Sequence, residues 1–269
     1  MQKGADEAIA ELAAQGIKVS YDWDAPPQAD VVMHTQRLED AIAKGPDVLI
    51  VSCLDAAADK PLIEEAQNRG IPVISFDTPC PDTSAEAFVG RYYYEEDGSD
   101  VANALAEAID FQGEVAILAG SPGAANHQQR VAGFKKAMEQ YPDIEIVAEE
   151  FDNDDIERAV NLTASMLQAH PELAGIFGAN ASAPVGAGRA IVEAGKQDDV
   201  VLIGMDDMPD MVSFVKDGTA HAMSVQNVPQ IGYWSILYAV ARSQDRPIPA
   251  IHDTGSLLVT QDMVDTYKD

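Results

Sequence analysis

The sequence predicts an α/β protein of two lobes, each a doubly wound parallel sheet with helices on both faces. Strand-like and helix-like segments alternate along almost the whole chain, which indicates βαβ units. The strand-like runs are continuously apolar, as strands covered on both faces are. The chain of 269 residues is too rich in such runs for one sheet, and its length suits two smaller ones.

The expected strands are short runs of β-branched and other apolar residues. They cover residues 17–21, 48–52, 72–76, 115–119, 144–151, 174–178 and 200–205.

The expected helices lie between the strands and carry apolar residues every three or four positions, the spacing of a buried helical stripe. The stripes are Ile9, Leu12 and Ala13; Val101, Leu105 and Ile109; Val131, Phe134 and Met138; Ile156, Val160, Thr163 and Leu167; and Ile231, Trp234 and Tyr238.

Composition excludes several classes of protein. The formal charge of −28 disfavours nucleic acid as a partner, because the chain repels phosphate backbones. No apolar run approaches the ~20 residues of a membrane span. Two cysteines, Cys53 and Cys80, are too few for a zinc cluster or a disulfide scaffold.

The residues that follow the expected strands form the candidate site, because ligands of doubly wound sheets bind at the carboxyl ends of the strands. This set is rich in carboxylates and amides and has one aromatic ring, which suits a ligand with many hydroxyl groups better than a single reactive centre. It comprises residues 52–55, Asp77 and Thr78, 120–123, 151–153, Asn180, Asp206 and Asp207, and Gln226 and Asn227.

The motifs that resemble catalytic sites fail in detail. Residues 119–123 look like a nucleophile elbow, but Pro122 follows the serine and has no N–H for an oxyanion hole. The five histidines show no paired spacing, and residues 152–155 lack the glycine of a calcium loop. That acidic run fits a helix N-terminus. We therefore predict no enzyme, no cofactor and no metal site.

Five segments in order resemble the ribose-binding type of periplasmic sugar-binding proteins, which serve ABC transporters and have the type I periplasmic binding protein fold. The segments are residues 70–77 (GIPVISFD), 130–134 (RVAGF), 170–177 (HPELAGIF), 202–210 (LIGMDDMPD) and 225–232 (VQNVPQIG). The resemblance covers nearly the whole chain.

The resemblance implies a sugar-binding cleft between the lobes. Asp77 would accept hydrogen bonds from sugar hydroxyls, Arg130 would donate to them, and Phe151 would lie against the ring. The remaining implied ligand residues are Asn180, Asp206, Gln226 and Tyr92, with Arg91 as an alternative to Tyr92. Structural roles stay open as well: Asp77 and Asp206 as turn caps, Arg130 paired with a surface acid, and Phe151 as core.

The resemblance also implies how the chain is organised and where it works. One lobe comprises residues 1–110 and 228–251, the other residues 111–227 and 252–269, with hinges near Phe111, Val228 and Ile251. A monomer captures a sugar or polyol by closure outside the cytoplasm and delivers it to a membrane permease. The alternatives are the effector domain of a lactose-repressor-type transcription factor and a periplasmic sugar sensor.

Three departures from the family pattern argue against ribose as the ligand. Thr78 stands where ribose binders often carry arginine, and Ala181 where aspartate is common. Residues 91–93 (RYY) replace an acid–amide pair.

Two further expectations concern the first lobe. Compared with the family, the chain lacks the first strand and any export signal, because residues 3–5 (KGA) of the first helix come directly after the start. Residues 17–21 and 48–52 should then lie in one sheet with an unfilled place between them. Cys53 and Cys80 each follow a strand and could form a disulfide, although two partly buried free thiols are the favoured interpretation.

Overall fold

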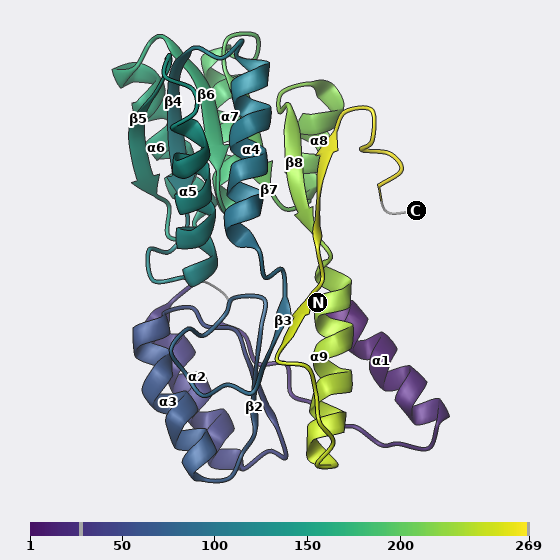
Figure 1. Ribbon diagram of the computed structural model, residues 1–269. Coiled ribbons are helices and arrows are strands. Elements are labelled where there is room, and N and C mark those ends of the chain that lie inside the picture. The colour runs from purple at the N-terminus through teal and green to yellow at the C-terminus, as the bar shows by residue number, and fades with distance from the viewer. Residues whose placement is uncertain (27–28, 268–269) are drawn as a thin grey trace. The chain divides into compact units, whose positions relative to one another are not determined.

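The computed structural model describes residues 1–26 and 29–267 (Figure 1). Contacts divide the chain into two compact units. The first unit comprises Met1–Tyr92, Gly123–Ala125 and Gln226–Gly255. The second comprises Tyr93–Pro122, Asn126–Val225 and Ser256–Asp269. No described helix has both the length and the apolar character that a membrane span requires.

The first unit contains a four-stranded parallel sheet in the order β1-β2-β3-β9. Its strands are β1 (Leu49–Val51), β2 (Val73–Phe76), β3 (Ala87–Gly90) and β9 (Ile251–Asp253). Its helices are α1 (Gln2–Ala14), α2 (Val31–Lys44), α3 (Ala56–Asn68) and α9 (Val228–Ser243).

Alternate strand residues of this sheet pack on opposite faces. Leu49 and Val51 join the core formed with α2 and α3. Ile50, between them, joins the core formed with α1 and α9. A strand covered on both sides needs apolar residues at every position, which explains the continuous apolar runs in the sequence.

The second unit contains a six-stranded sheet in the order β10-β8-β7-β6-β4-β5, parallel from β5 through β8. Its strands are β4 (Gly113–Ala119), β5 (Ile144–Phe151), β6 (Leu173–Gly178), β7 (Val201–Met205), β8 (Ala222–Gln226) and β10 (Ser256–Thr260). Its helices are α4 (Tyr94–Ala108), α5 (Ala125–Met138), α6 (Ile156–Ala169), α7 (Ser182–Ala194) and α8 (Pro209–Asp217).

The central strand β4 shows the two-faced packing of this second sheet most clearly. Val115, Ile117 and Ala119 belong to the core beneath α4 and α5. Ala116 and Leu118 belong to the core on the other face, with α6 and α7. The predicted doubly wound α/β class is therefore confirmed.

Six of the seven predicted strands are confirmed as β1, β2, β4, β5, β6 and β7. The strands β3, β8, β9 and β10 were not predicted, since β3 is a short run that ends in glycine and the other three contain polar residues. The contact division also assigns α4 to the second unit, whereas the predicted boundary at residue 110 assigned it to the first lobe.

The strand predicted at residues 17–21 is wrong: the segment is not in a strand. Its alternate residues Ile17, Val19 and Tyr21 pack with α1, α9 and Ile50 of β1. A strand needs a neighbouring ladder as well as an apolar face, and β1 is the terminal strand of its sheet. The lacking first strand stays a prediction.

Candidate ligand-binding site

The predicted site residues lie at the carboxyl ends of strands in both units. In the second unit, Phe151 ends β5, Asn180 follows β6 and Asp206 follows β7. In the first unit, Asp77 follows β2 and Tyr92 follows β3. Gln226 ends β8 and groups with the first unit by its contacts.

Arg130 is the largest side chain that is buried almost completely, with 1% of its surface exposed. Its Nη1 donates to the carbonyl of Ala179 at 3.1 Å, and its Cζ lies 5.0 Å from the centre of the Tyr94 ring. Nε and Nη2 are buried and have no hydrogen-bond partner among the described residues. Since buried donors are almost always paired, these two N–H groups are available to a bound molecule that accepts hydrogen bonds.

The backbone of Arg130 is fixed by the close approach of α4 and α5. A Cβ added at Gly98 of α4 would lie 2.0 Å from the carbonyl oxygen of Arg130. A Cβ at Gly133 would lie 2.0 Å from the carbonyl oxygen of Glu95. Each helix therefore places a glycine against the backbone of the other. This close packing of α4 on α5 fixes the position of the Arg130 backbone.

Asn180 lies at the centre of a buried polar cluster, which comprises Asp152, Asp154, Asn180 and Ser182. Its Nδ2 lies 2.7 Å from Asp154 Oδ1, 3.1 Å from Asp152 Oδ1 and 2.8 Å from Ser182 Oγ. Its Oδ1 accepts from the N–H of Ala183 at 3.1 Å. Both ends of the Asn180 amide therefore have hydrogen-bond partners within the unit.

The acidic members of the polar cluster come from residues 152–155, a run whose first two residues were predicted to follow a strand at the candidate site and which was also predicted to begin a helix. Asp155 is indeed the N-cap of α6, accepting from the N–H of Arg158 at 2.8 Å. Asp152 and Asp154 instead face Asn180 and Ser121, whose N–H donates to Asp154 Oδ2 at 3.2 Å. The run of acidic residues at 152–155 is visible in the sequence. Only the structure shows that Asp155 caps α6 while Asp152 and Asp154 join the polar cluster.

Burial shifts the pKa values of two titratable groups, Asp152 and His127, in opposite directions. Burial raises the pKa of Asp152 to about 6, against hydrogen bonds from Ser182, Asp154 and Asn180 that favour the carboxylate. Burial lowers the pKa of His127 to about 4, and the nearby Arg130 adds to this effect while Asp154 opposes it. Both groups are therefore disposed toward their neutral forms.

These two shifts are expected to cancel in the pH dependence of stability. Between about pH 6 and 5 the folded state binds a proton at Asp152 that the unfolded chain does not, and the unfolded chain binds one at His127 that the folded state does not. In Asp152→Asn only the histidine effect remains. That variant should lose about 1 kcal/mol of unfolding free energy per pH unit, relative to the parent, as pH falls from 6 to 5.

The reverse variant isolates the other group. In His127→Gln only the Asp152 effect remains, so unfolding free energy should rise, relative to the parent, over the same fall in pH. Urea unfolding at several pH values measures both slopes, and the remaining acidic groups are common to all three proteins. Two variants with the same slope as the parent would show that neither shift exists.

Asp77 and Asp206 share an unusual backbone geometry, one in each unit. Their φ angles are 57° and 63°, in the left-handed region that side chains other than glycine rarely adopt. The N–H of Asp77 donates to the carbonyl of Val89 at 3.0 Å, and that of Asp206 to the carbonyl of Ser224 at 2.8 Å. Each aspartate thus turns the chain sharply at the end of a parallel strand, a form of strain that clusters at functional sites.

The two predicted aromatic contacts differ in exposure. Tyr92 exposes 41% of its surface, and its ring centre lies 6.2 Å from that of Phe88. Asp253 accepts from the N–H of Tyr92 at 2.8 Å and pairs with Arg91 at 3.2 Å. Arg91 is therefore already engaged, and of the two Tyr92 is the exposed candidate. Phe151 is partly buried against the core under α4 and α5.

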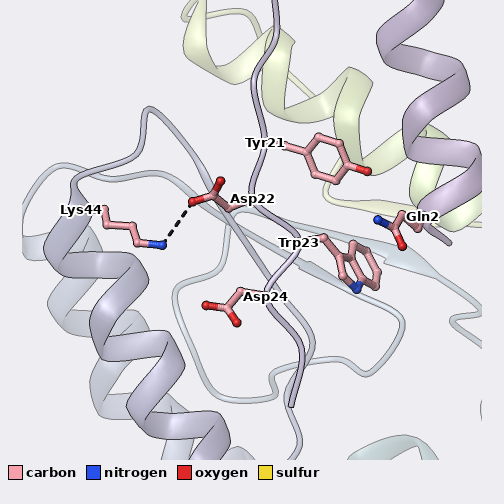
Figure 2. Close-up of a pocket in the computed structure, with 6 residues that line it drawn as sticks. All are labelled: Gln2, Tyr21, Asp22, Trp23, Asp24 and Lys44. Carbon is pink, nitrogen blue, oxygen red and sulfur yellow. Dashed lines mark hydrogen bonds and ion pairs between the residues drawn. The ribbon is translucent and has the colours of Figure 1, made fainter. Parts of the chain in front are cut away.

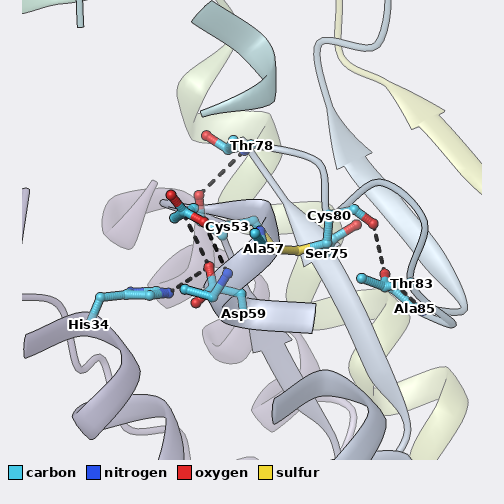
Figure 3. Close-up of a disulfide and its surroundings, with 12 residues drawn as sticks. His34, Cys53, Ala57, Asp59, Ser75, Thr78, Cys80, Thr83 and Ala85 are labelled. Atoms are coloured by element: carbon cyan, nitrogen blue, oxygen red, sulfur yellow. Dashed lines mark hydrogen bonds and ion pairs between the residues drawn. A yellow bond between two sulfur atoms is a disulfide. The ribbon is translucent and has the colours of Figure 1, made fainter. Parts of the chain in front are cut away.

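Cys53 and Cys80 form a disulfide, with Cα atoms 5.4 Å apart (Figure 3). The favoured expectation of two free thiols is therefore wrong. The parallel pairing of β1 with β2 brings the residues after these strands together, and only the fold shows that the two cysteines lie within bonding distance.

A separate cavity of about 420 Å³ lies in the first unit and contains none of the predicted site residues (Figure 2). Asp22 in its wall pairs with Lys44 at 3.2 Å, and Trp23 lies edge-on to Phe76 at 6.2 Å. Its lining residues are Gln2, Tyr21, Asp22, Trp23, Asp24 and Lys44. The strand-end residues, not this cavity, form the candidate site. The described residues contain no cluster of three or more metal-binding side chains.

Two doubly wound units with polar residues at the carboxyl ends of their strands have an arrangement in which ligands bind at the strand ends. The model of the periplasmic binding protein domain matches residues 1–246. The chain therefore belongs to the periplasmic binding protein domain family.

Individual relatives agree with this assignment. Ribose import binding protein RbsB of Bacillus subtilis is 28% identical over 233 residues, which are 86% of this chain and 72% of that protein. An ABC transporter solute-binding protein from Burkholderia graminis, solved with D-arabinose, matches 98% of this chain and 92% of its own with a TM-score of 0.90 at 28% identity. One from Actinobacillus succinogenes, solved with D-allose, has a TM-score of 0.86 at 31% identity and covers 99% of this chain and 93% of its own.

Proposed function

We propose that this protein is the solute-binding component of an ABC importer and captures a sugar or a sugar-like polyol. The observation that carries the proposal is the buried guanidinium of Arg130, two of whose N–H groups lack a partner among the described residues. Relatives named for ribose import, and solved structures with D-arabinose or D-allose, support a polyhydroxylated ligand.

The proposed site takes residues from both units. Asp77, Tyr92 and Gln226 would contact the ligand from the first unit, and Arg130, Phe151 and Asp206 from the second. Asn180 would support them through the polar cluster. Carboxylates accept from sugar hydroxyls, the guanidinium donates to them, and an aromatic face suits the C–H side of a ring.

The proposed mechanism is capture by closure, in which a ligand that contacts both units stabilises the closed form. A membrane permease would then recognise that form of the monomer. The Cys53–Cys80 disulfide supports work outside the cytoplasm, because such bonds persist in oxidising compartments. The names of the relatives favour transport over the effector domain of a transcription factor.

A thermal-shift screen tests this function directly. Pentoses, hexoses, polyols and inositols are added singly to the purified protein. A true ligand at 100 times its Kd should add about 2.7 kcal/mol to the unfolding free energy and raise Tm accordingly. If no sugar or polyol raises Tm while amino acids or other solutes do, the proposed ligand class is wrong.

A further inference from the structure

The disulfide joins the two loops that follow the parallel neighbours β1 and β2 (Figure 3). Cys53 exposes 1% of its surface and Cys80 exposes 7%. The bond is thus covered by the fold, and it spans two loops at the edge of the sheet where the ligand residue Asp77 lies.

The loop on the Cys80 side is short and carries Asp77. Only Thr78 and Pro79 separate Asp77 from Cys80. The N–H of Cys53 donates to the carbonyl of Thr78 at 3.2 Å, and the N–H of Thr78 lies 3.4 Å from Ser52 Oγ. The first distance is at the upper end of the usual hydrogen-bond range and the second is beyond it, and the disulfide adds a covalent link between the Asp77 loop and the end of β1.

The Cys53 side provides a firm anchor for that tie. Two residues after Cys53, the carboxylate of Asp55 caps α3 by accepting from the N–H groups of Ala57 and Ala58, both at 3.0 Å. Behind the cap, buried Asp59 lies 3.2 Å from His34 Nε2 and 3.4 Å from the backbone nitrogen of Asp55. The Cys53 loop is thus fixed to a capped helix and to α2.

The Asp77 loop needs such a tie because its backbone is held in an unfavourable conformation. Asp77 has a φ angle of 57°, and such residues persist only where the surroundings over-determine them. The N–H of Asp77 bonds to β3, and the disulfide fixes the loop three residues later. Between them, these two restraints hold the backbone that carries the Asp77 side chain.

We propose that the Cys53–Cys80 disulfide is a positioning element of the ligand site, which pre-organises Asp77 so that the oxidised protein binds its ligand more tightly than the reduced protein. This inference rests on the proposed function. It adds that the affinity for the ligand depends on whether the Cys53–Cys80 disulfide is oxidised or reduced. Pre-organisation raises affinity because the cost of ordering a loop is removed from the binding step.

The test compares the parent with Cys53→Ser/Cys80→Ser, using the sugar that the thermal-shift screen identifies. Isothermal titration measures Kd for both proteins at a temperature at which circular dichroism shows them folded. The variant should bind at least 10-fold more weakly. Leu38→Ala is the matched control: it removes a buried side chain from the core cluster that includes both cysteines, but lies on α2. This control should keep the parent affinity despite its lower stability.

A ligand-free measurement separates this inference from the proposed function. Amide hydrogen exchange at Asp77, Thr78 and Cys80 should be at least 10-fold faster in the serine variant than in the parent, with exchange in α9 unchanged. If the parent binds no sugar, the proposed function fails, whereas the exchange result still tests the positioning role. A folded serine variant with parent affinity overturns the inference.

Reduction of the parent keeps the inference testable even if the serine variant does not fold. The parent is brought to equilibrium in a series of dithiothreitol redox buffers, with and without saturating sugar, and free thiols are counted. Because the coupling between two equilibria is reciprocal, bound sugar should lower the equilibrium constant for reduction of the disulfide at least 10-fold. Equal constants in both samples overturn the inference.

Discussion

Replacing Arg130 with methionine is expected to remove sugar binding and leave the protein folded. The buried guanidinium has one hydrogen bond to Ala179 and one aromatic neighbour, while Nε and Nη2 are unmatched among the described residues. In the ligand complex these groups would donate to sugar hydroxyls, and charged hydrogen bonds of this kind contribute about 1.5–3 kcal/mol each. We therefore expect Kd to rise at least 100-fold, or about 3 kcal/mol.

The stability of Arg130→Met should change little. Methionine fills much of the same volume without bringing a charge into the core, and replacing a buried charge with an apolar residue is often neutral or stabilising. We expect the unfolding free energy to stay within about 1 kcal/mol of the parent value. Loss of function without loss of stability is the pattern expected of a binding residue.

Arg189→Met is the matched control for this experiment. Arg189 lies on α7 of the same unit and pairs with Asp210 at 2.6 Å. Calorimetric Kd values and urea unfolding curves are measured for both variants. Arg189→Met should bind like the parent. If Arg130→Met also binds like the parent, or if it unfolds, the guanidinium is structural and the observation that carries the proposed function fails.

The strands were predictable where burial on two faces makes every position apolar, as in residues 115–119 of β4. The same reasoning was wrong for residues 17–21, because an apolar alternation shows that a segment packs but not that its backbone has a ladder partner. The local sequence determines whether a segment has an apolar face that packs. Whether its backbone pairs in a sheet depends on which other segments of the chain lie beside it.

The candidate site was predictable only as far as strand ends determine it. The rule that ligands bind at carboxyl ends made Asp77, Asn180 and Asp206 candidates from the sequence, and the structure places all three just after strands. Arg130 lies on a helix and was found only through the family resemblance. The inward direction of the Asn180 amide, toward Asp152 and Asp154, required coordinates because the same residue could equally have faced a ligand.

The disulfide between Cys53 and Cys80 also could not be predicted from the sequence alone. Their places after consecutive strands allowed a bridge but did not require one, since a disulfide forms only when two Cα atoms lie within about 7 Å. The register that aligns Val51 with Ser75 brings the following loops together and gives a Cα separation of 5.4 Å. The positions of the cysteines in the sequence allow a disulfide, and the register of β1 against β2 brings them close enough to form it.

Replacing Asp77 with alanine is expected to remove most of the affinity, about 2 kcal/mol or more, which corresponds to at least a 30-fold rise in Kd. The carboxylate would accept hydrogen bonds from sugar hydroxyls, and its loss leaves those hydroxyls unpaired in a desolvated site. Asp77→Asn should lose less, because asparagine keeps one acceptor oxygen. Asparagine also tolerates the left-handed backbone that Asp77 adopts.

A backbone effect must be separated from the loss of the acceptor, because alanine is strained at a φ angle of 57°. Asp82→Ala provides the matched control. Asp82 lies in the same connection between β2 and β3, has a φ angle of 56°, is exposed, and has no proposed contact with the ligand. Both alanine variants should lose about 1–2 kcal/mol of stability from this strain, and Asp77→Ala alone should lose affinity. If Asp82→Ala weakens sugar binding as much as Asp77→Ala does, the effect comes from the loop backbone, and Asp77 is not a ligand residue.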